Sequence, residues 1–253
     1  MGIDIGAATS KGVLVENGKV VAHRLVPSRS DYRVAAEKVR LRLLATVGLS
    51  QEDIRCTVAT GRGAATVAFA DRRIPDIVCC GRGTKTIFPS VCTVIDVGDQ
   101  SSQVIRIDRE GKVVNFVHAE KCAAGSGRFL QVIANVLRIN LDDIGPLSLK
   151  SNNPVTFTTG CAVFGETEVV SRVAEGDTVE DILAGVHKAL AQKVCTLVER
   201  LGKEGDYAIV GGGGLDVGLV KAIEKELAVR ILVPSQPQIV AALGAAIIAA
   251  EEC

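Results

Sequence analysis

The feature that most constrains this chain is an internal repeat of an acidic bend followed by a hairpin pattern. The first copy places Asp4 and Gly6 after an apolar start, and the second places Asp96 and Gly98 in the same setting. Each bend is followed by an apolar run, a Gly turn and a second apolar run. Each copy therefore predicts a strand, a tight loop, a second strand, a Gly turn and a third strand.

The bends have the composition of phosphate-binding loops. An Asp-x-Gly bend leaves bare backbone where an anion can approach, and small side chains beyond it leave backbone N–H groups accessible. Either copy alone would also fit a plain β-meander, because such bends are common in ordinary turns. Since two copies occur with matching turns downstream, we interpret both as candidate phosphate loops. In the first copy the small residues are Ala7, Ala8, Thr9 and Ser10.

A third glycine-rich site follows a short apolar strand at 207–210 and precedes a helical pattern that runs to Leu227. Consecutive glycines at the start of a helix permit a ligand to approach the backbone closely. A flexible connector is the alternative, but the run lies between two well-patterned elements. Its members are Gly211, Gly212, Gly213 and Gly214.

Strands and helical patterns alternate along the chain, which predicts the α/β class. We expect Asp31 to cap one helix and Asp177, with an acidic residue three positions later, to open a longer one. Pro234 and Pro237 are expected to break the chain before a final Ala-rich helix.

Charge and hydropathy exclude two classes of partner. Lys and Arg total 29 and Asp and Glu total 29, so the chain lacks the basic surface that a non-specific nucleic-acid binder needs. The longest apolar run is too short to cross a bilayer. The N-terminus shows neither a basic segment nor an apolar signal segment, so we expect a cytoplasmic protein with reduced thiols.

Two cysteines precede helical patterns, Cys122 in a Gly-rich turn and Cys161 directly before an apolar-periodic segment. A helix N-terminus stabilises the thiolate, which is the form that zinc and iron–sulfur clusters bind. Their separation matches no single-chain zinc or ferredoxin pattern, so spacing alone leaves a buried-thiol role open. Packing roles are expected for Cys79, Cys80 and Cys195, and isolated, hydrogen-bonded roles for His23, His118 and His187.

The segments that begin at these two cysteines carry a resemblance. They read Cys-Ala-Ala-Gly-Ser-Gly-Arg-Phe-Leu from Cys122 and Cys-Ala-Val-Phe-Gly-Glu-Thr-Glu-Val from Cys161. Both resemble the motifs of activators of 2-hydroxyacyl-CoA dehydratases and of the ATPase subunits of benzoyl-CoA reductase. The resemblance covers essentially the whole chain. Its cysteine motifs are specific, whereas the phosphate loops are shared with sugar kinases, actin and Hsp70-type chaperones.

The resemblance implies an actin-like ATPase fold with two duplicated lobes and ATP in the cleft between them. The N-terminal lobe would span 1–90, with a C-terminal helix near 238–253 packing back on it. The C-terminal lobe would span 91–237 and carry the cluster cysteines. A homodimer would share one [4Fe–4S] cluster, held by Cys122 and Cys161 of each subunit.

The implied activity is ATP hydrolysis with Mg²⁺, coupled to electron transfer in anaerobic metabolism. A low-potential electron would pass from the cluster to a 2-hydroxyacyl-CoA dehydratase-like partner or a related reductase. Ferredoxin or flavodoxin would be the electron donor. No nucleic acid and no membrane is expected as a partner.

The resemblance also implies residue roles. Asp4 and Asp96 would organise Mg²⁺ and the attacking water, and Gln100 would lie near the γ-phosphate. The glycine run would hold the nucleoside together with Gln238. The phosphates would be held by Gly6, Ala7, Ala8, Thr9, Ser10, Lys11 and Gly98.

The chain departs from the family pattern mainly around the nucleotide. Asp99 stands where a second Gly is usual, and an added carboxylate repels phosphate unless Mg²⁺ intervenes. The glycine run reads Gly-Gly-Gly-Gly-Leu-Asp to Asp216, instead of the usual Gly-Gly-Val-Ala-x-Asn. Three further departures are Ala7 for Ser, Cys80 for His and Ser101 for Asp.

Two other functions fit the same fold. A small-molecule kinase would need a substrate pocket and a catalytic base but no metal-binding thiols, so iron and acid-labile sulfide in anaerobically purified protein separate it from the activator. A non-catalytic actin-like scaffold would bind nucleotide and polymerise, so sedimentation with and without ATP separates it.

Overall fold

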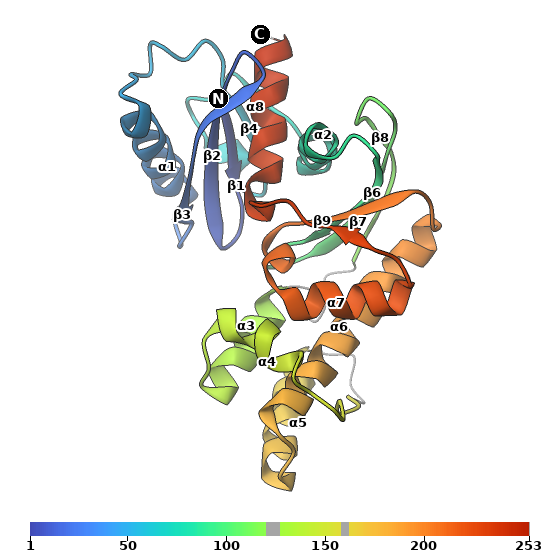
Figure 1. Ribbon diagram of the computed structural model, residues 1–253. Coiled ribbons are helices and arrows are strands. Elements are labelled where there is room, and N and C mark those ends of the chain that lie inside the picture. Colours follow the sequence, from blue (N-terminus) through green and yellow to red (C-terminus); the bar gives the residue numbers. More distant parts are fainter. Residues whose placement is uncertain (120–126, 158–161, 253) are drawn as a thin grey trace. The chain divides into compact units, whose positions relative to one another are not determined.

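The computed structural model describes residues 1–119, 127–157 and 162–252. Contacts within the chain divide it into two compact units (Figure 1). Unit 1 comprises Met1–Val94, Ile105–Asn115 and Pro234–Cys253, and unit 2 comprises Ile95–Val104 and Phe116–Val233.

The sheet of unit 1 has the strand order β3-β2-β1-β4-β5. Its β1 is antiparallel to β2, with Asp4 opposite Lys11, and parallel to β4, with Asp4 beside Thr60. Asp4 therefore lies in the middle strand, close to the end where the first candidate loop begins. The strands are β1 (Gly2–Ile5), β2 (Thr9–Glu16), β3 (Lys19–Pro27), β4 (Val58–Thr60) and β5 (Arg72–Arg73).

Helices cover both faces of this sheet. Ile3 and Ile5 pack with α1 (Tyr32–Val47), whereas Val13 packs with α8 (Val240–Glu252). Alternate strand residues point to opposite faces, and Val13 lies beside Gly2 in the ladder, so α1 and α8 cover opposite faces. A Cβ on Gly2 would overlap the Ala242 carbonyl, so α8 approaches β1 closely only because that residue is glycine.

The predicted start of α1 is confirmed. Asp31 Oδ1 accepts hydrogen bonds from the backbone N–H groups of Arg33 (2.9 Å) and Val34 (3.3 Å). These contacts satisfy two of the donors that a helix leaves free at its first turn. The remaining helix of unit 1, α2 (Asp76–Ile87), packs along α8.

The second sheet has the order β10-β9-β6-β7-β8. If the strands of each sheet are numbered in chain order and the second sheet is read from β8 to β10, both sheets have the order third, second, first, fourth and fifth strand. This identity confirms the internal repeat, the α/β class and the duplicated actin-like ATPase fold. The strands are β6 (Val91–Val97), β7 (Ser102–Ile107), β8 (Val113–His118), β9 (Asp206–Val210) and β10 (Ile231–Leu232).

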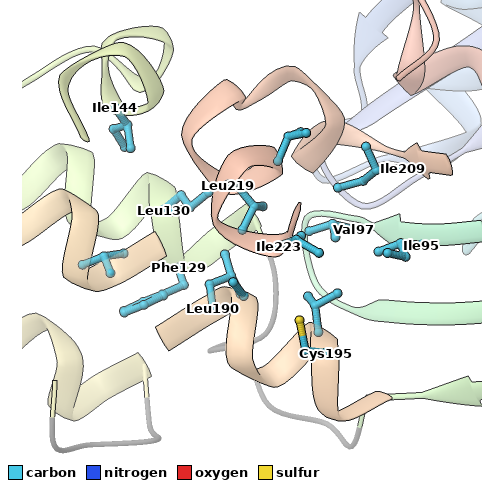
Figure 2. Packing of buried hydrophobic residues seen from close by; sticks show 14 of the residues in the cluster. Ile95, Val97, Phe129, Leu130, Ile144, Leu190, Cys195, Ile209, Leu219 and Ile223 are labelled. Carbon is cyan, nitrogen blue, oxygen red and sulfur yellow. The ribbon is translucent and has the colours of Figure 1, made fainter. Parts of the chain in front are cut away.

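Unit 2 contains one continuous apolar core. Figure 2 shows Ile95 of β6, Ile209 of β9 and the helical side chains of Leu190 and Ile223 gathered in it, with the Cys195 side chain also in the cluster. The helices around it are α3 (Gly127–Leu137), α4 (Leu141–Ser148), α5 (Ala162–Glu175), α6 (Val179–Leu201) and α7 (Val217–Leu227).

The predicted start of α6 at Asp177 is wrong by one residue. Thr178 is the N-cap, and its hydroxyl accepts the backbone N–H of Asp181 at 3.2 Å. Asp177 Oδ2 instead lies 3.7 Å from Arg172 on the preceding helix. Average N-cap preference ranks Asp above Thr, so it favoured Asp177, whereas in the structure Asp177 faces Arg172 and Thr178 makes the cap contact. Across the described segments, no helix combines the length and the apolar character needed to cross a bilayer.

Candidate functional site

The first candidate phosphate loop joins β1 to β2. It is closed by a hydrogen bond from the Gly6 N–H to the Thr9 carbonyl (3.1 Å). Beside it, Lys11 Nζ donates to Asp4 Oδ2 (3.0 Å) in a largely buried ion pair. A Cβ on Gly6 would lie 2.8 Å from both Lys11 Nζ and the Thr9 carbonyl, so this tight turn requires glycine. The loop thus brings a carboxylate, an ammonium group and accessible backbone together, with Ala8 at its exposed tip.

Ser10 lies within the support of this loop. Its side chain is fully buried, and its hydroxyl lies 2.8 Å from the Ser28 hydroxyl, which in turn donates to the Gly6 carbonyl (2.7 Å). The Ser28 N–H also donates to the Ala8 carbonyl (2.9 Å). The hydroxyl that we expected on phosphate is therefore used to hold the loop in shape. Ser28 was missed, because nothing in its sequence setting links it to the loop.

The second candidate loop joins β6 to β7 through the same turn. The Gly98 N–H donates to the Ser101 carbonyl (2.9 Å), three residues on, as in the first loop. Asp96 Oδ2 accepts a hydrogen bond from Gln103 Nε2 (2.9 Å). Gln103 and Lys11 each follow their aspartate by seven residues, so they occupy matching positions in the two copies. Asp4 thus has a cationic partner in Lys11, and Gln103 offers Asp96 a neutral amide at the matching position.

The glycine run brings the chain back to the second loop. Gly211 has a φ of 78°, a left-handed conformation that favours glycine, and a Cβ there would lie 2.6 Å from Asp96 Oδ1. A Cβ on Gly213 would lie 2.5 Å from the Val97 side chain. The predicted catalytic carboxylate and the predicted nucleoside segment are therefore neighbours in unit 2.

Sequence reasoning missed a matching glycine pair in unit 1. Gly61 has a φ of 83°, and a Cβ there would overlap the Asp4 carboxylate. A Cβ on Gly63 would overlap the Ile5 side chain, as one on Gly213 would meet its counterpart in unit 2. The signal was present, since the short apolar strand β4 is followed by Gly-Arg-Gly much as β9 is followed by the glycine run.

The second loop is bonded directly to the beginning of α3. The Gly127 N–H donates to the Gly98 carbonyl and the Arg128 N–H to the Asp99 carbonyl, both at 2.9 Å. The first backbone N–H groups of a helix have no partner within it, and two of those in α3 are bonded to carbonyls of the second loop. Gln100 is exposed on the same loop, and the Asp99 side chain is half-buried.

The first turns of α3 and α5 are in contact. A Cβ on Gly165 of α5 would lie 2.9 Å from the Phe129 ring of α3, so the two helices approach closely because Gly165 has no side chain. Cys122 and Cys161, the predicted metal ligands in the segments before these helices, lie outside the described residues. In the described part of the chain, no group of three His, Cys, Asp or Glu side chains is placed to hold a metal ion.

Other cysteines behave as packing residues. Cys79 and Cys80 of α2 and Cys195 of α6 are buried free thiols. Burial raises the pKa of Cys79 and of Cys195 to about 12 each, which keeps both protonated and unreactive. Cys56 is disulfide-bonded, contrary to the expectation that all thiols stay reduced.

The remaining predicted residues divide between the units. Gln238 is half-buried in the short 3₁₀ helix Pro237–Ile239, directly before α8, in unit 1 with the first loop. The second loop and the glycine run belong to unit 2.

Comparison with known proteins matches this arrangement to one family. The model of the BadF/BadG/BcrA/BcrD ATPase family matches residues 1–249. The 2-hydroxyisocaproyl-CoA dehydratase activator of Clostridioides difficile is 38% identical over all of this chain and 95% of its own. A benzoyl-CoA reductase component of Thauera aromatica is 34% identical over 89% of this chain and 82% of its own. The structure of the Clostridium difficile activator with bound ADPNP, 38% identical, superposes with a TM-score of 0.95 over 99% of this chain and 94% of its own.

Proposed function

Because the chain belongs to the BadF/BadG/BcrA/BcrD ATPase family, we propose that it is an ATP-dependent reductive activator. ATP hydrolysis would drive transfer of a low-potential electron to a 2-hydroxyacyl-CoA dehydratase-like partner or a related reductase. The observation that carries this proposal is the pair of hydrogen bonds joining the second phosphate loop to the start of α3. They connect a nucleotide-type loop to the helix that follows the Cys122 motif.

In this proposal both loops serve ATP with Mg²⁺. The Lys11 ammonium and the accessible N–H groups of the first loop attract phosphate oxygens by charge-assisted hydrogen bonds. Asp96, which accepts a hydrogen bond from Gln103, is assigned the holding of Mg²⁺ and the orientation of water, with Gln100 on the same loop near the γ-phosphate. The glycine run and Gln238 serve the nucleoside.

A change at the second loop has a direct route to the cysteine-motif helices. Any movement of the Gly98 and Asp99 carbonyls must carry the N-terminus of α3 with it or break two hydrogen bonds. Because Phe129 packs against Gly165 without intervening side-chain volume, α5 must adjust to α3. Loss of the γ-phosphate is therefore expected to alter the relative placement of the two helices.

The donor chemistry of this region fits an iron–sulfur cluster. In the sequence, Cys161 directly precedes α5 and Cys122 stands five residues before α3 begins. The first turns of these two helices touch, and a helix N-terminus stabilises a thiolate. A four-iron cluster takes four thiolates, so two chains would contribute two each, and the protein is proposed to be a homodimer. When bound, the cluster would supply a one-electron carrier of low potential. Ferredoxin or flavodoxin is proposed as the donor and the cytoplasm as the location.

The deciding experiment is anaerobic purification followed by iron and acid-labile sulfide analysis, with ATPase assays on oxidised and reduced protein. We expect one four-iron cluster per homodimer. Cys161→Ser should abolish iron binding and weaken the dimer, because metal binding free energy contributes to assembly. Cys195→Ser is the matched control and should keep both. A Cys161→Ser protein with full iron content, or a wild-type monomer with an intact cluster, would overturn the proposal.

A further inference from the structure

A buried hydrogen-bonded network joins three helices of unit 2 at the end of the glycine run. His187 of α6 is 1% exposed, and its two ring nitrogens have different partners. Nε2 lies 2.9 Å from Asp216 Oδ2, and Nδ1 lies 2.9 Å from the Ser148 hydroxyl at the end of α4. That hydroxyl also donates to the Gly145 carbonyl (2.8 Å).

Asp216 is the N-cap of α7 and uses both carboxylate oxygens. Oδ1 accepts the backbone N–H groups of Gly218 (2.9 Å) and Leu219 (3.1 Å), while Oδ2 faces His187. The Asp216 N–H donates to the Gly213 carbonyl (3.2 Å). The residue that His187 holds is therefore tied to both the glycine run and the first turn of α7.

The helices around this network are packed without spare volume. A Cβ on Gly145 would lie 2.6 Å from Asp216 Oδ1, and one on Gly218 would overlap the Ser148 hydroxyl. Ile144 and Leu219, the chain neighbours of these glycines, are fully buried in the core of unit 2 (Figure 2). Two glycines at the contact thus bring α4 and the start of α7 together around the His187 ring.

Both ring nitrogens of His187 have a polar neighbour in this network. Nε2 faces the Asp216 carboxylate and Nδ1 faces the Ser148 hydroxyl. Removal of one partner from such a buried network leaves the other polar group unsatisfied, which is costly.

We propose that His187, through Asp216, is a positioning residue for the nucleoside-binding segment Gly211–Gly214. The inference rests on the proposed function, which assigns that segment to ATP. Asp216 stands two residues after Gly214, and its N–H is bonded to the Gly213 carbonyl, so its placement sets the backbone that approaches the ligand. Ser148 orients the ring, because Nδ1 keeps its partner only in one ring orientation. His187 does not touch the nucleotide in this proposal.

Two substitutions of His187 test the contacts of its two ring nitrogens separately. His187→Gln can place an amide N–H where Nε2 stood and keep the contact with Asp216. His187→Asn reaches only to the Nδ1 position, so it can keep the Ser148 contact but lose Asp216. Leu190→Ala is the control, since Leu190 is fully buried on the same helix and in the same core without belonging to the network.

The probes are ADP and inorganic tripolyphosphate, with affinities measured by isothermal titration calorimetry on the full-length protein. We expect His187→Asn to weaken ADP binding about tenfold, the usual scale for losing one hydrogen bond to a charged group, and to leave tripolyphosphate binding unchanged. His187→Gln should bind ADP within about threefold of wild type. Leu190→Ala should lower thermal stability at least as much without this selectivity for ADP.

The outcomes separate this inference from the proposed function. A wild-type protein that binds neither probe overturns the proposed function and the positioning role with it. The positioning role alone is overturned if His187→Asn binds ADP as tightly as the wild type does. It is also overturned if His187→Asn binds both probes more weakly by the same factor. If His187→Asn does not fold, Ser148→Ala replaces it, and the same selective loss of ADP affinity, of smaller size, is expected. An equal loss for both probes in Ser148→Ala would also contradict the proposal.

Discussion

The two halves of this chain share one backbone plan and differ in the chemistry placed on it. In unit 1 the aspartate at the end of β1 is paired with an ammonium group, Lys11. In unit 2 the aspartate of β6 is hydrogen-bonded by an amide, Gln103, at the matching position. Both aspartates lie against a glycine with positive φ, Gly61 or Gly211, because any larger residue would meet the carboxylate.

The loops also differ in what holds them. The carbonyls of the first loop accept hydrogen bonds from Ser28, which follows β3. The carbonyls of the second loop accept backbone N–H groups from the first turn of α3. Duplication thus preserved the two turns, each of which starts at a glycine N–H, while side chains and attachments diverged. In the proposed function, the first loop attracts phosphate by charge and the second couples the nucleotide to the cysteine-motif helices.

The largest expected effect tests the charge difference between the two aspartates. Asp96→Asn should lower kcat for ATP hydrolysis about a thousandfold, since it removes the carboxylate assigned to Mg²⁺ and water. Asp4→Asn should lower it only about tenfold, because the Lys11 ammonium stays in place. Steady-state ATPase assays on reduced protein measure both. Equal losses would show that the amide and ammonium partners do not distinguish the two sites.

The next largest effect concerns the glycine beside Asp4. Gly61→Ala should lower the free energy of unfolding by about 3 kcal/mol, because it combines a strained φ with overlap of a buried carboxylate. Gly18→Ala is matched in φ, at 75°, but has nothing within 4 Å, so it should cost about 1 kcal/mol. Urea denaturation gives both values. If the two variants had the same free energy of unfolding, the close approach of Gly61 to Asp4 would make no measurable contribution to stability.

A reciprocal exchange of side chains between Lys11 and Gln103 tests whether the two loops have different roles. Lys11→Gln makes the first loop resemble the second and should weaken ATP binding about tenfold, since one charge-assisted contact is lost. Gln103→Lys makes the second loop resemble the first and should raise the Mg²⁺ concentration needed for hydrolysis, because a cation competes for Asp96. Titration calorimetry and Mg²⁺-dependent ATPase assays read the two effects. Changes in the same parameter for both variants would contradict the assigned division of roles.

The smallest expected effect concerns thiols that both units bury. At pH 8 iodoacetamide should modify the half-buried Cys92 well before Cys79 of unit 1 or Cys195 of unit 2, whose pKa values are about 12. Only about one molecule in ten thousand would carry either buried thiolate at that pH. Because folding raises these pKa values, stability should fall as pH rises from the ordinary cysteine range toward 12. Mass spectrometry of native protein after timed alkylation checks the order, and early labelling of Cys195 would show that unit 2 opens locally.

Sequence alone determined the parts of this protein that depend on local backbone geometry and repetition. The two Asp-x-Gly bends, the α/β class and the helix cap at Asp31 follow from turn and cap chemistry, which involves residues only a few positions apart. The family followed from the cysteine motifs around Cys122 and Cys161, whose order is a property of the chain and needs no coordinates.

Which side chains share a contact across long stretches of sequence depends on the packing of the folded chain. Lys11 opposite Asp4 follows from strand register, and the meeting of Gly61 with Asp4 requires β4 to pair with β1. The buried position of Ser10, its support by Ser28 and the joining of Ser148, His187 and Asp216 depend in the same way on which elements pack together. Such contacts arise because each buried polar group must find a partner after the fold has formed, and many sequence positions could supply one.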